Sequence, residues 1–153
     1  IEAYDATNRE GHAAKVYFNA LFGMDFTRNA DNATNAALNY GYGILLSAFN
    51  REIAVSGYLT QVGLFHTNIY NPYNFSCDLM EPYRALIDRF VLEMKPTVFE
   101  KTEKHAMWNI LNSEVKIANM THTVLNSIKV YCHSVFDALN EGDASKIVFY
   151  RRK

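Results

Sequence analysis

The sequence predicts a mainly α-helical protein, organised as one domain over residues 1–153, and three observations support this class. Long segments carry apolar residues at three- and four-residue spacing, which is the period of an amphipathic helix. Glycine follows the first two of these segments, as it often does at helix C-termini. With 49% hydrophobic residues, the chain is also long enough to bury one sizeable core. No repeat or low-complexity tract divides it, so a single helical domain is expected.

The first two predicted helices span residues 10–22 and about 33–56. Apolar side chains occupy much of the surface of the first segment, so this helix is expected to be largely buried. The second segment contains Gly41 and Gly43, and each glycine inside a helix costs roughly 1 kcal/mol relative to alanine. These glycines indicate that another helix or a ligand approaches closely at this level.

The third predicted helix begins near Asp78, after a loop at about 66–76, and ends at Met94. Pro82 would then lie in the first turn, where a proline removes no intrahelical hydrogen bond. The acidic residues at this helix start would also be favoured by the helix dipole. A helix start at Asp78 is therefore expected.

The C-terminal part is predicted to hold one short and one long helix. Residues 97–113 have the pattern of a mostly exposed amphipathic helix, and 115–119 form a brief non-helical link. A long helix is expected over about 121–139. The tail at 146–153 is either a strand or frayed.

Composition restricts the class of function. The chain carries 15 Lys and Arg against 16 Asp and Glu, so its net charge of -1 provides no global attraction for nucleic acid. Cys77 and Cys132 have no metal-binding spacing, which is typical of reduced thiols in the cytosol. No apolar run approaches the roughly 20 residues that span a bilayer. A cytoplasmic protein without a membrane partner is expected.

The segment DLMEPYR, residues 78–84, contains the most suggestive group of polar residues. Asp78 and Glu81 are three positions apart and share one helix face, and His66 precedes them in the loop. Two carboxylates and one imidazole suit a divalent ion such as Mg²⁺ or Mn²⁺. An ordinary acidic helix start explains the same two carboxylates and is the commoner case. Periodicity does not choose a further acidic ligand among Glu10, Glu52, Asp88 and Glu93.

Four segments in order resemble the CRISPR adaptation integrases, the catalytic subunits that insert new spacers into a CRISPR array. The segments are REGHAAKVYF (9–18), ATNAALNYGYGILLSAF (33–49), GYLTQVGLFHTN (57–68) and DLMEPYRALID (78–88). The likeness is to the type II branch and is strongest between residues 9 and 91. Because four ordered motifs at matching separations are far more specific than one, the chain is identified as a member of this family.

The resemblance implies an all-helical catalytic lobe that binds one divalent ion, Mg²⁺ or Mn²⁺, through Glu10, His66 and Glu81. Asp78 is an additional ligand in some relatives. The implied activity is that of a DNA endonuclease and strand-transferase of prokaryotic antiviral defence. The 3′ hydroxyl of the incoming DNA attacks a phosphodiester at the repeat boundary, and water in its place gives DNA cleavage.

The resemblance also implies the partners. These are double-stranded DNA with 3′ ends, CRISPR repeat DNA and a small ferredoxin-like adaptation protein. Relatives carry an N-terminal β-sandwich domain that makes most of the homodimer, and that domain is absent from residues 1–153. The chain is therefore expected to be a fragment. The alternative function is that of a catalytically silent helical module that binds DNA or a partner.

DNA is expected to be held near the ion by local basic side chains, because the net charge contributes nothing. Each such residue is equally consistent with a solvated surface position or an ion pair. Arg84 in particular pairs with Asp88 or orients Glu81 in the alternative interpretation. The candidates are Arg9, Lys15, Arg28, Arg51 and Arg84.

Overall fold

The structure, a computed structural model, describes residues 8–152 and is mainly α-helical, which confirms the predicted fold class. The α-helices are α1 (Arg9–Phe22), α2 (Ala33–Val55), α3 (Asn74–Met94), α4 (Lys101–Trp108) and α5 (Val124–Glu141). Two short 3₁₀ helices, η2 (Asn109–Asn112) and η3 (Ala144–Lys146), and three strands, β1 (Glu114–Ile117), β2 (Met120–Thr123) and β3 (Arg151–Arg152), complete the order. Across the described range, no helix is long and apolar enough to cross a membrane.

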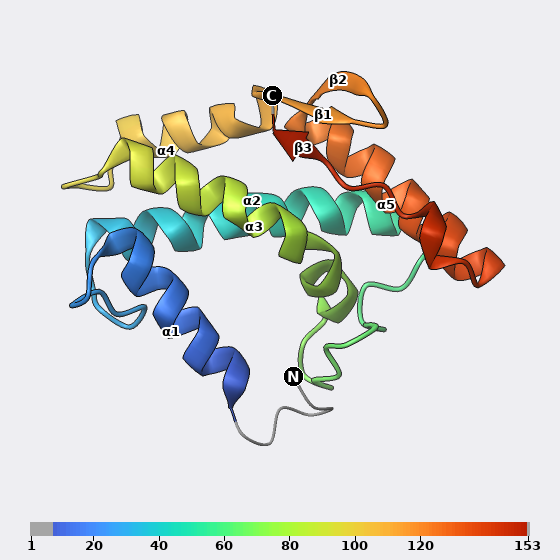
Figure 1. Cartoon of the computed structure of the whole chain (residues 1–153), viewed down its shortest axis with the longest axis horizontal. Helices are drawn as coiled ribbons and strands as arrows, with labels where there is room; N and C mark the ends of the chain where they lie inside the picture. Colours follow the sequence, from blue (N-terminus) through green and yellow to red (C-terminus); the bar gives the residue numbers. More distant parts are fainter. Residues whose placement is uncertain (1–7, 153) are drawn as a thin grey trace.

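Helix α2 runs through the middle of the molecule and packs against α3, α4 and α5 (Figure 1). Gly41 explains how closely these helices approach. A Cβ atom at this position would lie 2.5 Å from a methyl group of Ile87 on α3 and 2.5 Å from Met107 on α4. The close approach predicted from the glycines is therefore confirmed at Gly41. It is wrong at Gly43, which is exposed and would have nothing within 4 Å of its Cβ.

Helix α1 has the predicted boundaries but is not buried. None of its residues is buried, and Val16 and Tyr17 remain 58% and 41% exposed. Only one edge of α1 packs on the core, through Phe18 and Phe22. The prediction of a largely buried first helix is wrong. The apolar side chains of a helix become buried only where other elements pack on them, and its apolar content alone does not determine this.

Helix α3 begins at Asn74, one turn before the predicted start. Asn74 is buried, and its side-chain amide donates hydrogen bonds to the backbone oxygens of Gln61 at 3.0 Å and Asn68 at 2.8 Å. These contacts fold the preceding loop back and let the helix start earlier. Pro82 consequently lies inside α3 and offers no N–H to the Asp78 carbonyl one turn earlier. The predicted first-turn position of Pro82 is wrong.

The small sheet is a feature beyond the predicted all-helical lobe. Strands β1 and β2 form an antiparallel hairpin, joined by Ala118 and Asn119 at φ angles of 50° and 63°. Left-handed backbone at both positions is typical of the tight two-residue hairpin turn. Strand β3 pairs with the other side of β1, giving the order β2-β1-β3. The C-terminal tail is therefore a strand at its end, one of the two predicted possibilities.

The tail also contacts α3 before it reaches the sheet. The hydroxyl of Tyr150 donates to the backbone oxygen of Pro82 at 3.2 Å, and its ring lies 4.5 Å from the ring of Tyr83. Tyr83 is fully buried. These contacts place the tail against the segment of α3 that carries the candidate site.

Candidate metal and DNA site

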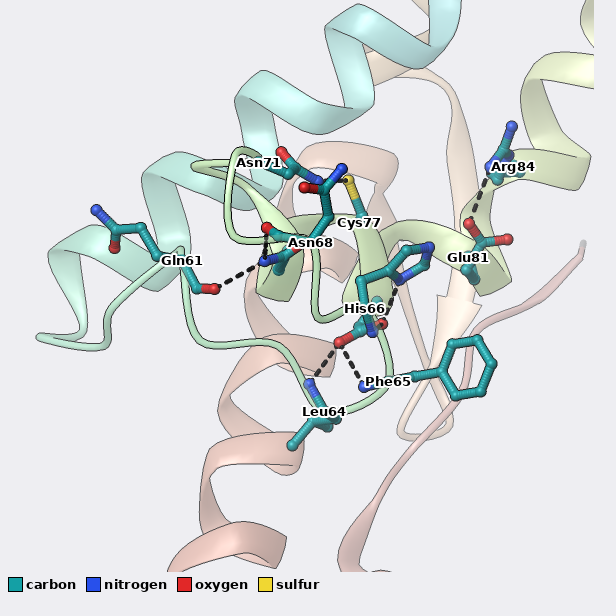
Figure 2. A network of polar contacts seen from close by, with 11 residues as sticks. Gln61, Leu64, Phe65, His66, Asn68, Asn71, Cys77, Glu81 and Arg84 are labelled. Atoms are coloured by element: carbon teal, nitrogen blue, oxygen red, sulfur yellow. Dashed lines mark hydrogen bonds and ion pairs between the residues drawn. The ribbon is translucent and has the colours of Figure 1, made fainter. Parts of the chain in front are cut away.

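The loop at 57–73 is fastened to α3 by the Asn74 amide and by the carboxylate of Asp78, whose partners Leu64, Phe65 and His66 are labelled in Figure 2. This carboxylate accepts backbone N–H groups from Leu64 at 2.5 Å, Phe65 at 3.0 Å and His66 at 3.1 Å. Gly63 permits this approach, because a Cβ there would lie 2.8 Å from an Asp78 oxygen and 2.3 Å from the His66 carbonyl. The loop therefore closes over Asp78 in one fixed conformation.

The imidazole of His66 is the fourth hydrogen-bond partner of the same carboxylate. Its Nδ1 lies 2.5 Å from Oδ1 of Asp78, whose side chain is only 8% exposed while that of His66 is 37% exposed. This contact occupies Nδ1 and leaves Nε2 as the second ring nitrogen. Metal-binding histidines commonly make this contact to a carboxylate with the nitrogen that does not bind the ion.

Hydrogen bonding keeps Asp78 ionised. Burial alone would raise the pKa of this carboxyl, but the backbone of Phe65, the ring and backbone of His66, and the backbone of Leu64 together outweigh burial and lower the pKa below its usual value. A negative Asp78 can therefore hold His66 at neutral pH.

Glu81 lies one turn after Asp78 on the exposed side of α3. Its Oε1 accepts a hydrogen bond from Arg84 at 2.9 Å, and the Arg84 guanidinium lies 4.4 Å from the centre of the Tyr42 ring. Burial alone would lower the pKa of Arg84, but the adjacent Glu81 outweighs it and the pKa lies above the usual value. Arg84 thus orients Glu81, and Figure 2 shows the His66 ring turned toward the Glu81 carboxylate.

Glu10 faces Glu81 from another helix. Both line a groove of about 490 Å³ that separates α1 from α3, whereas His66 does not line it. The groove walls also contain Ala13, Ala14, Tyr17, Phe18, Tyr42, Arg84, Ala85 and Asp88. The fold therefore brings Glu10 and Glu81 to one groove and pairs His66 with Asp78 beside it.

The Glu10–Glu81 pair and the His66–Asp78 pair do not form a single metal-binding group. Within residues 8–152, no three Asp, Glu, His or Cys side chains form a group able to hold a metal ion. The donor types nevertheless fit a divalent ion, since two carboxylates and an imidazole with a carboxylate on its other nitrogen are suitable ligands. The ligand assignment to Glu10, His66 and Glu81 stays a prediction.

Asp88 is a buried acid that links three helices. It is 3% exposed, one oxygen accepts from the Tyr42 hydroxyl of α2, and the other accepts from the Tyr17 hydroxyl of α1 at 2.8 Å. Burial raises its pKa, although the two tyrosines, Arg84 and Arg28 oppose this. Burial and the Asp88 contact also raise the pKa of Tyr17 to about 12.

Sequence patterns contain only a weak signal for this group. Asp88 stands between the core residues Ile87 and Val91, so an acid occupies a position on the apolar side of the helix. Its tyrosine partners are 71 and 46 residues away in the chain, and no local spacing identifies them. We refer to Tyr17, Tyr42 and Asp88 as the tyrosine–aspartate knot.

Four of the five predicted DNA-contacting residues, Arg9, Arg28, Arg51 and Arg84, already have interaction partners. Arg28 donates to the side chains of Asn35 at 2.6 Å and Asn39 at 2.7 Å, which ties the loop before α2 to that helix. Arg51 pairs with its neighbour Glu52 at 2.8 Å, and Arg84 holds Glu81. Arg9 and Lys15 lie exposed on α1. Both residues belong to the helix that forms the α1 wall of the groove, and Arg9 also has an interaction partner of its own.

Comparison with known proteins adds a family to this geometry. The family described as "CRISPR associated protein Cas1" matches residues 5–116. A relative from Neisseria meningitidis serogroup C (strain 8013), named CRISPR-associated endonuclease Cas1, is 47% identical over 94 residues, which are 61% of this chain and 31% of the relative. A second, CRISPR-associated endonuclease Cas1 1 from Francisella tularensis subsp. novicida (strain U112), is 32% identical over 101 residues, or 60% of this chain and 32% of the relative. The matches thus span about a third of each relative's length.

Two solved structures share the fold. "Casposase bound to integration product" superposes with a TM-score of 0.76 at 20% identity and covers 93% of this chain and 52% of that chain. "Cas6-RT-Cas1--Cas2 complex" superposes with a TM-score of 0.74 at 17% identity and covers 96% of this chain and 19% of that chain. At these identities the likeness establishes the arrangement of helices alone.

Proposed function

The chain belongs to the CRISPR-associated protein Cas1 family, and from this premise we propose that it is the catalytic lobe of a CRISPR spacer integrase. The proposed reaction is DNA strand transfer by 3′-hydroxyl attack on a phosphodiester at the repeat boundary, with endonuclease cleavage when water replaces the hydroxyl. The endonuclease names of its relatives support this class of reaction. The observation that carries the proposal is the His66–Asp78 pair, which stands one helical turn from Glu81.

The proposed ligands of a divalent ion, Mg²⁺ or Mn²⁺, are Glu10, His66 and Glu81. Such an ion supplies Lewis-acid activation of the phosphorus. His66 offers Nε2 because Asp78 engages Nδ1, and Asp78 itself already accepts four hydrogen bonds. We therefore assign Asp78 the role of positioning His66. It is proposed as a metal ligand only in addition to Glu10, His66 and Glu81.

The remaining residues of the groove would orient groups and hold DNA. Arg84 donates a hydrogen bond to Oε1 of Glu81 and so orients this carboxylate. The other oxygen, Oε2, is the one proposed to bind the ion. Lys15 and Arg9 are the proposed phosphate contacts, since both are exposed on the helix that forms one wall of the groove. Neither protein nucleophile nor covalent intermediate is required, because the nucleophile is a hydroxyl of DNA or water.

The proposed partners follow the family. They are spacer-precursor DNA with 3′ ends, CRISPR repeat DNA and a small ferredoxin-like adaptation protein. A homodimer would form through the N-terminal domain that relatives carry. The fold likeness to a chain of a Cas1–Cas2 complex is consistent with such an assembly.

Titration of this chain with Mn²⁺ tests the site. Calorimetry is expected to detect one site, which His66→Ala and Glu81→Ala abolish because each removes a proposed ligand. Glu93→Ala is the matched control, since it removes an exposed glutamate of the same helix that pairs with Arg89. Binding that is the same in the wild type and in both ligand variants would refute the assignment.

Activity is tested on this chain joined to the proposed N-terminal domain, together with the proposed partner protein. A labelled oligonucleotide with a 3′ hydroxyl is expected to join repeat DNA only when Mg²⁺ or Mn²⁺ is present. The same oligonucleotide with a 3′ deoxy end should give no product, because the attacking oxygen is missing. Joining of the blocked oligonucleotide would exclude the proposed nucleophile.

A second function is favoured by one observation, the lack of a three-ligand group among the described residues. On this alternative, the chain by itself is a catalytically silent helical module that binds DNA or a partner. Crystals soaked in Mn²⁺ distinguish the two functions. An ordered ion between Glu10, His66 and Glu81 would support catalysis, and separated side chains without an ion would support the silent module.

A further inference from the structure

A second groove lies at the sheet, between the β1–β2 turn and the C-terminal tail. Its volume is about 510 Å³, and its lining includes Lys116, Asn119, Phe149 and Arg151. In Figure 1 the sheet lies at the top of the molecule, and the loop at 57–73 lies at the bottom. The sheet groove shares no lining residue with the groove between α1 and α3, and nothing in the proposed chemistry accounts for it.

Two cations lie side by side on the sheet face that lines this groove. Lys116 on β1 and Arg151 on β3 are direct partners in the antiparallel pairing, so their side chains leave the same face of the sheet. Both residues are exposed. Like charges directly opposite each other destabilise a sheet, and a strand pair of this kind normally carries opposite or neutral side chains.

No acidic side chain of residues 8–152 forms an ion pair with either cation. The exposed face of β1 also carries Glu114, but at the opposite end of the strand from the turn. The positive pair thus stands at the turn end, where the groove opens. A pair of unneutralised cations in a hollow is suited to an anion with oxygens on two sides.

An exposed aromatic ring stands beside the cations. Phe149 lies two residues before Arg151, lines the same groove and is 57% exposed. Grooves that combine basic residues with exposed aromatic rings are typical of sites for single-stranded nucleic acid, where phosphates meet the cations and bases stack on the rings. A purely acidic peptide has no group that would use the ring.

We propose that the sheet groove is a second DNA-binding site, in which Lys116 and Arg151 hold one backbone phosphate and Phe149 stacks on a base or sugar. This inference rests on the proposed function, because it assumes that DNA is the substrate. A phosphate between the cations replaces their repulsion with two charge-assisted contacts. The site gives the C-terminal tail a role in holding DNA.

The test is DNA binding in EDTA, which isolates this site from any metal-dependent binding. Fluorescence anisotropy of a labelled single strand of about 20 nucleotides and of a matching duplex is measured from about 50 to about 200 mM salt. The double variant Lys116→Ala/Arg151→Ala is expected to bind about 10-fold more weakly at low salt. Its salt dependence should fall by about one in slope, as expected for the loss of one phosphate contact.

Control variants separate a site from general charge. Lys101→Ala/Lys129→Ala removes two exposed positive charges elsewhere and should leave the slope unchanged. The double variant Lys116→Arg/Arg151→Lys keeps both positive charges and should bind DNA as tightly as the wild type. Phe149→Ala should weaken binding of the single strand and leave the duplex unaffected if the ring stacks on bases.

Three results would overturn the inference: no DNA binding by the wild type in EDTA, equal binding by the wild type and the Lys116/Arg151 double variant, or equally tight binding of polyglutamate. The last would identify an acidic protein as the ligand. Binding of Mn²⁺ by the double variant should match the wild type. Loss of the ion in His66→Ala with intact DNA binding in EDTA would show that the two sites are independent, so failure of one leaves the other standing.

Discussion

Helices α1 and α3 form the two walls of one groove, but they are attached to the protein in different ways. Helix α3 has nine buried residues and packs along α2, whereas α1 has none. Glu81 is therefore carried by the core, and Glu10 by a helix that lies on the surface. One half of the proposed site is fixed by packing, and the other half depends on a few contacts.

Those few contacts can be identified. Phe22 packs on Phe26, with ring centres 4.9 Å apart, and Phe18 lies beneath the guanidinium of Arg28. The tyrosine–aspartate knot adds the hydrogen bond from Tyr17 to the buried Asp88. Because the knot is a polar link from α1 to the buried Asp88, changes there should loosen α1 without disturbing α3.

The largest effect is expected for Asp88→Ala. The substitution leaves the hydroxyls of Tyr17 and Tyr42 without their acceptor, and Tyr42 is itself buried. Loss of a buried acceptor of two hydrogen bonds is expected to cost about 3 kcal/mol of the free energy of unfolding, measured by urea denaturation. Hydrogen exchange should quicken in α1 and stay slow in α3.

Asp137→Ala is the matched control for this change, because Asp137 is an exposed aspartate on α5. Its free energy of unfolding should stay within about 0.5 kcal/mol of the wild type. If α1 amides in Asp88→Ala stay as protected as in the wild type, the aromatic contacts alone hold the helix.

The next effect concerns the core side of the comparison. Gly41→Ala should cost about 2 kcal/mol of the free energy of unfolding, because its methyl group would collide with Ile87 of α3 and Met107 of α4. Gly43→Ala, two residues away on the open side, should stabilise by up to about 1 kcal/mol through helix propensity alone. Thermal unfolding of the two variants measures the difference. Equal effects would show that α2 and α3 are not closely packed.

A smaller effect is expected for Tyr17→Phe, which removes one hydroxyl from the knot and keeps the ring. It should cost about 1 kcal/mol and quicken hydrogen exchange in α1. Tyr40→Phe removes a hydroxyl of the same kind, one that accepts from the Trp108 indole at 3.0 Å. Its cost should be similar, but α1 should exchange as in the wild type. Faster exchange of α1 in both variants would mean that the knot has no special role.

Sequence patterns predicted the features that depend on neighbouring residues. The second helix, expected over about 33–56, spans Ala33–Val55, because helical period and a following glycine are local signals. His66 and Asp78 are 12 residues apart, and the sequence grouped them as candidate ligands of one ion, although it did not predict their direct contact. In both cases the interacting residues are close in sequence, so their arrangement leaves a recognisable pattern.

Features that depend on distant residues were missed. Helix α3 starts early because Asn74 binds the loop backbone, and β1 becomes a central strand because β3 joins it from the far end of the chain. The roles of Asp78 and Asp88 likewise rest on tertiary contacts. The Asp78 carboxylate accepts hydrogen bonds from loop N–H groups, and the Asp88 carboxylate accepts them from two tyrosines. Spacing could nominate these acids but could not assign their partners.

The smallest effect is expected from pH, and it has opposite signs at these two acids. Asp78 has a lowered pKa in the folded protein, so its contribution to stability is present above its unfolded pKa and is lost as pH falls through the folded value. Asp88 has a raised pKa, so its contribution is full below the unfolded pKa and is lost as pH rises through the folded value. Acid should therefore loosen the loop at 57–73 while it favours the knot.

NMR at decreasing pH measures both responses in the same sample. The amide signals of Leu64 and Phe65 should shift and broaden once pH falls through the Asp78 pKa, because protonation removes their charged acceptor. Amides of α1 should stay protected over the same range, since a protonated Asp88 still accepts from the tyrosines. Asp88→Asn has no titrating group at this position, so the loop should respond as before while the pH dependence of the knot disappears. If α1 loosens at the same pH as the loop, the two walls of the groove are not held independently.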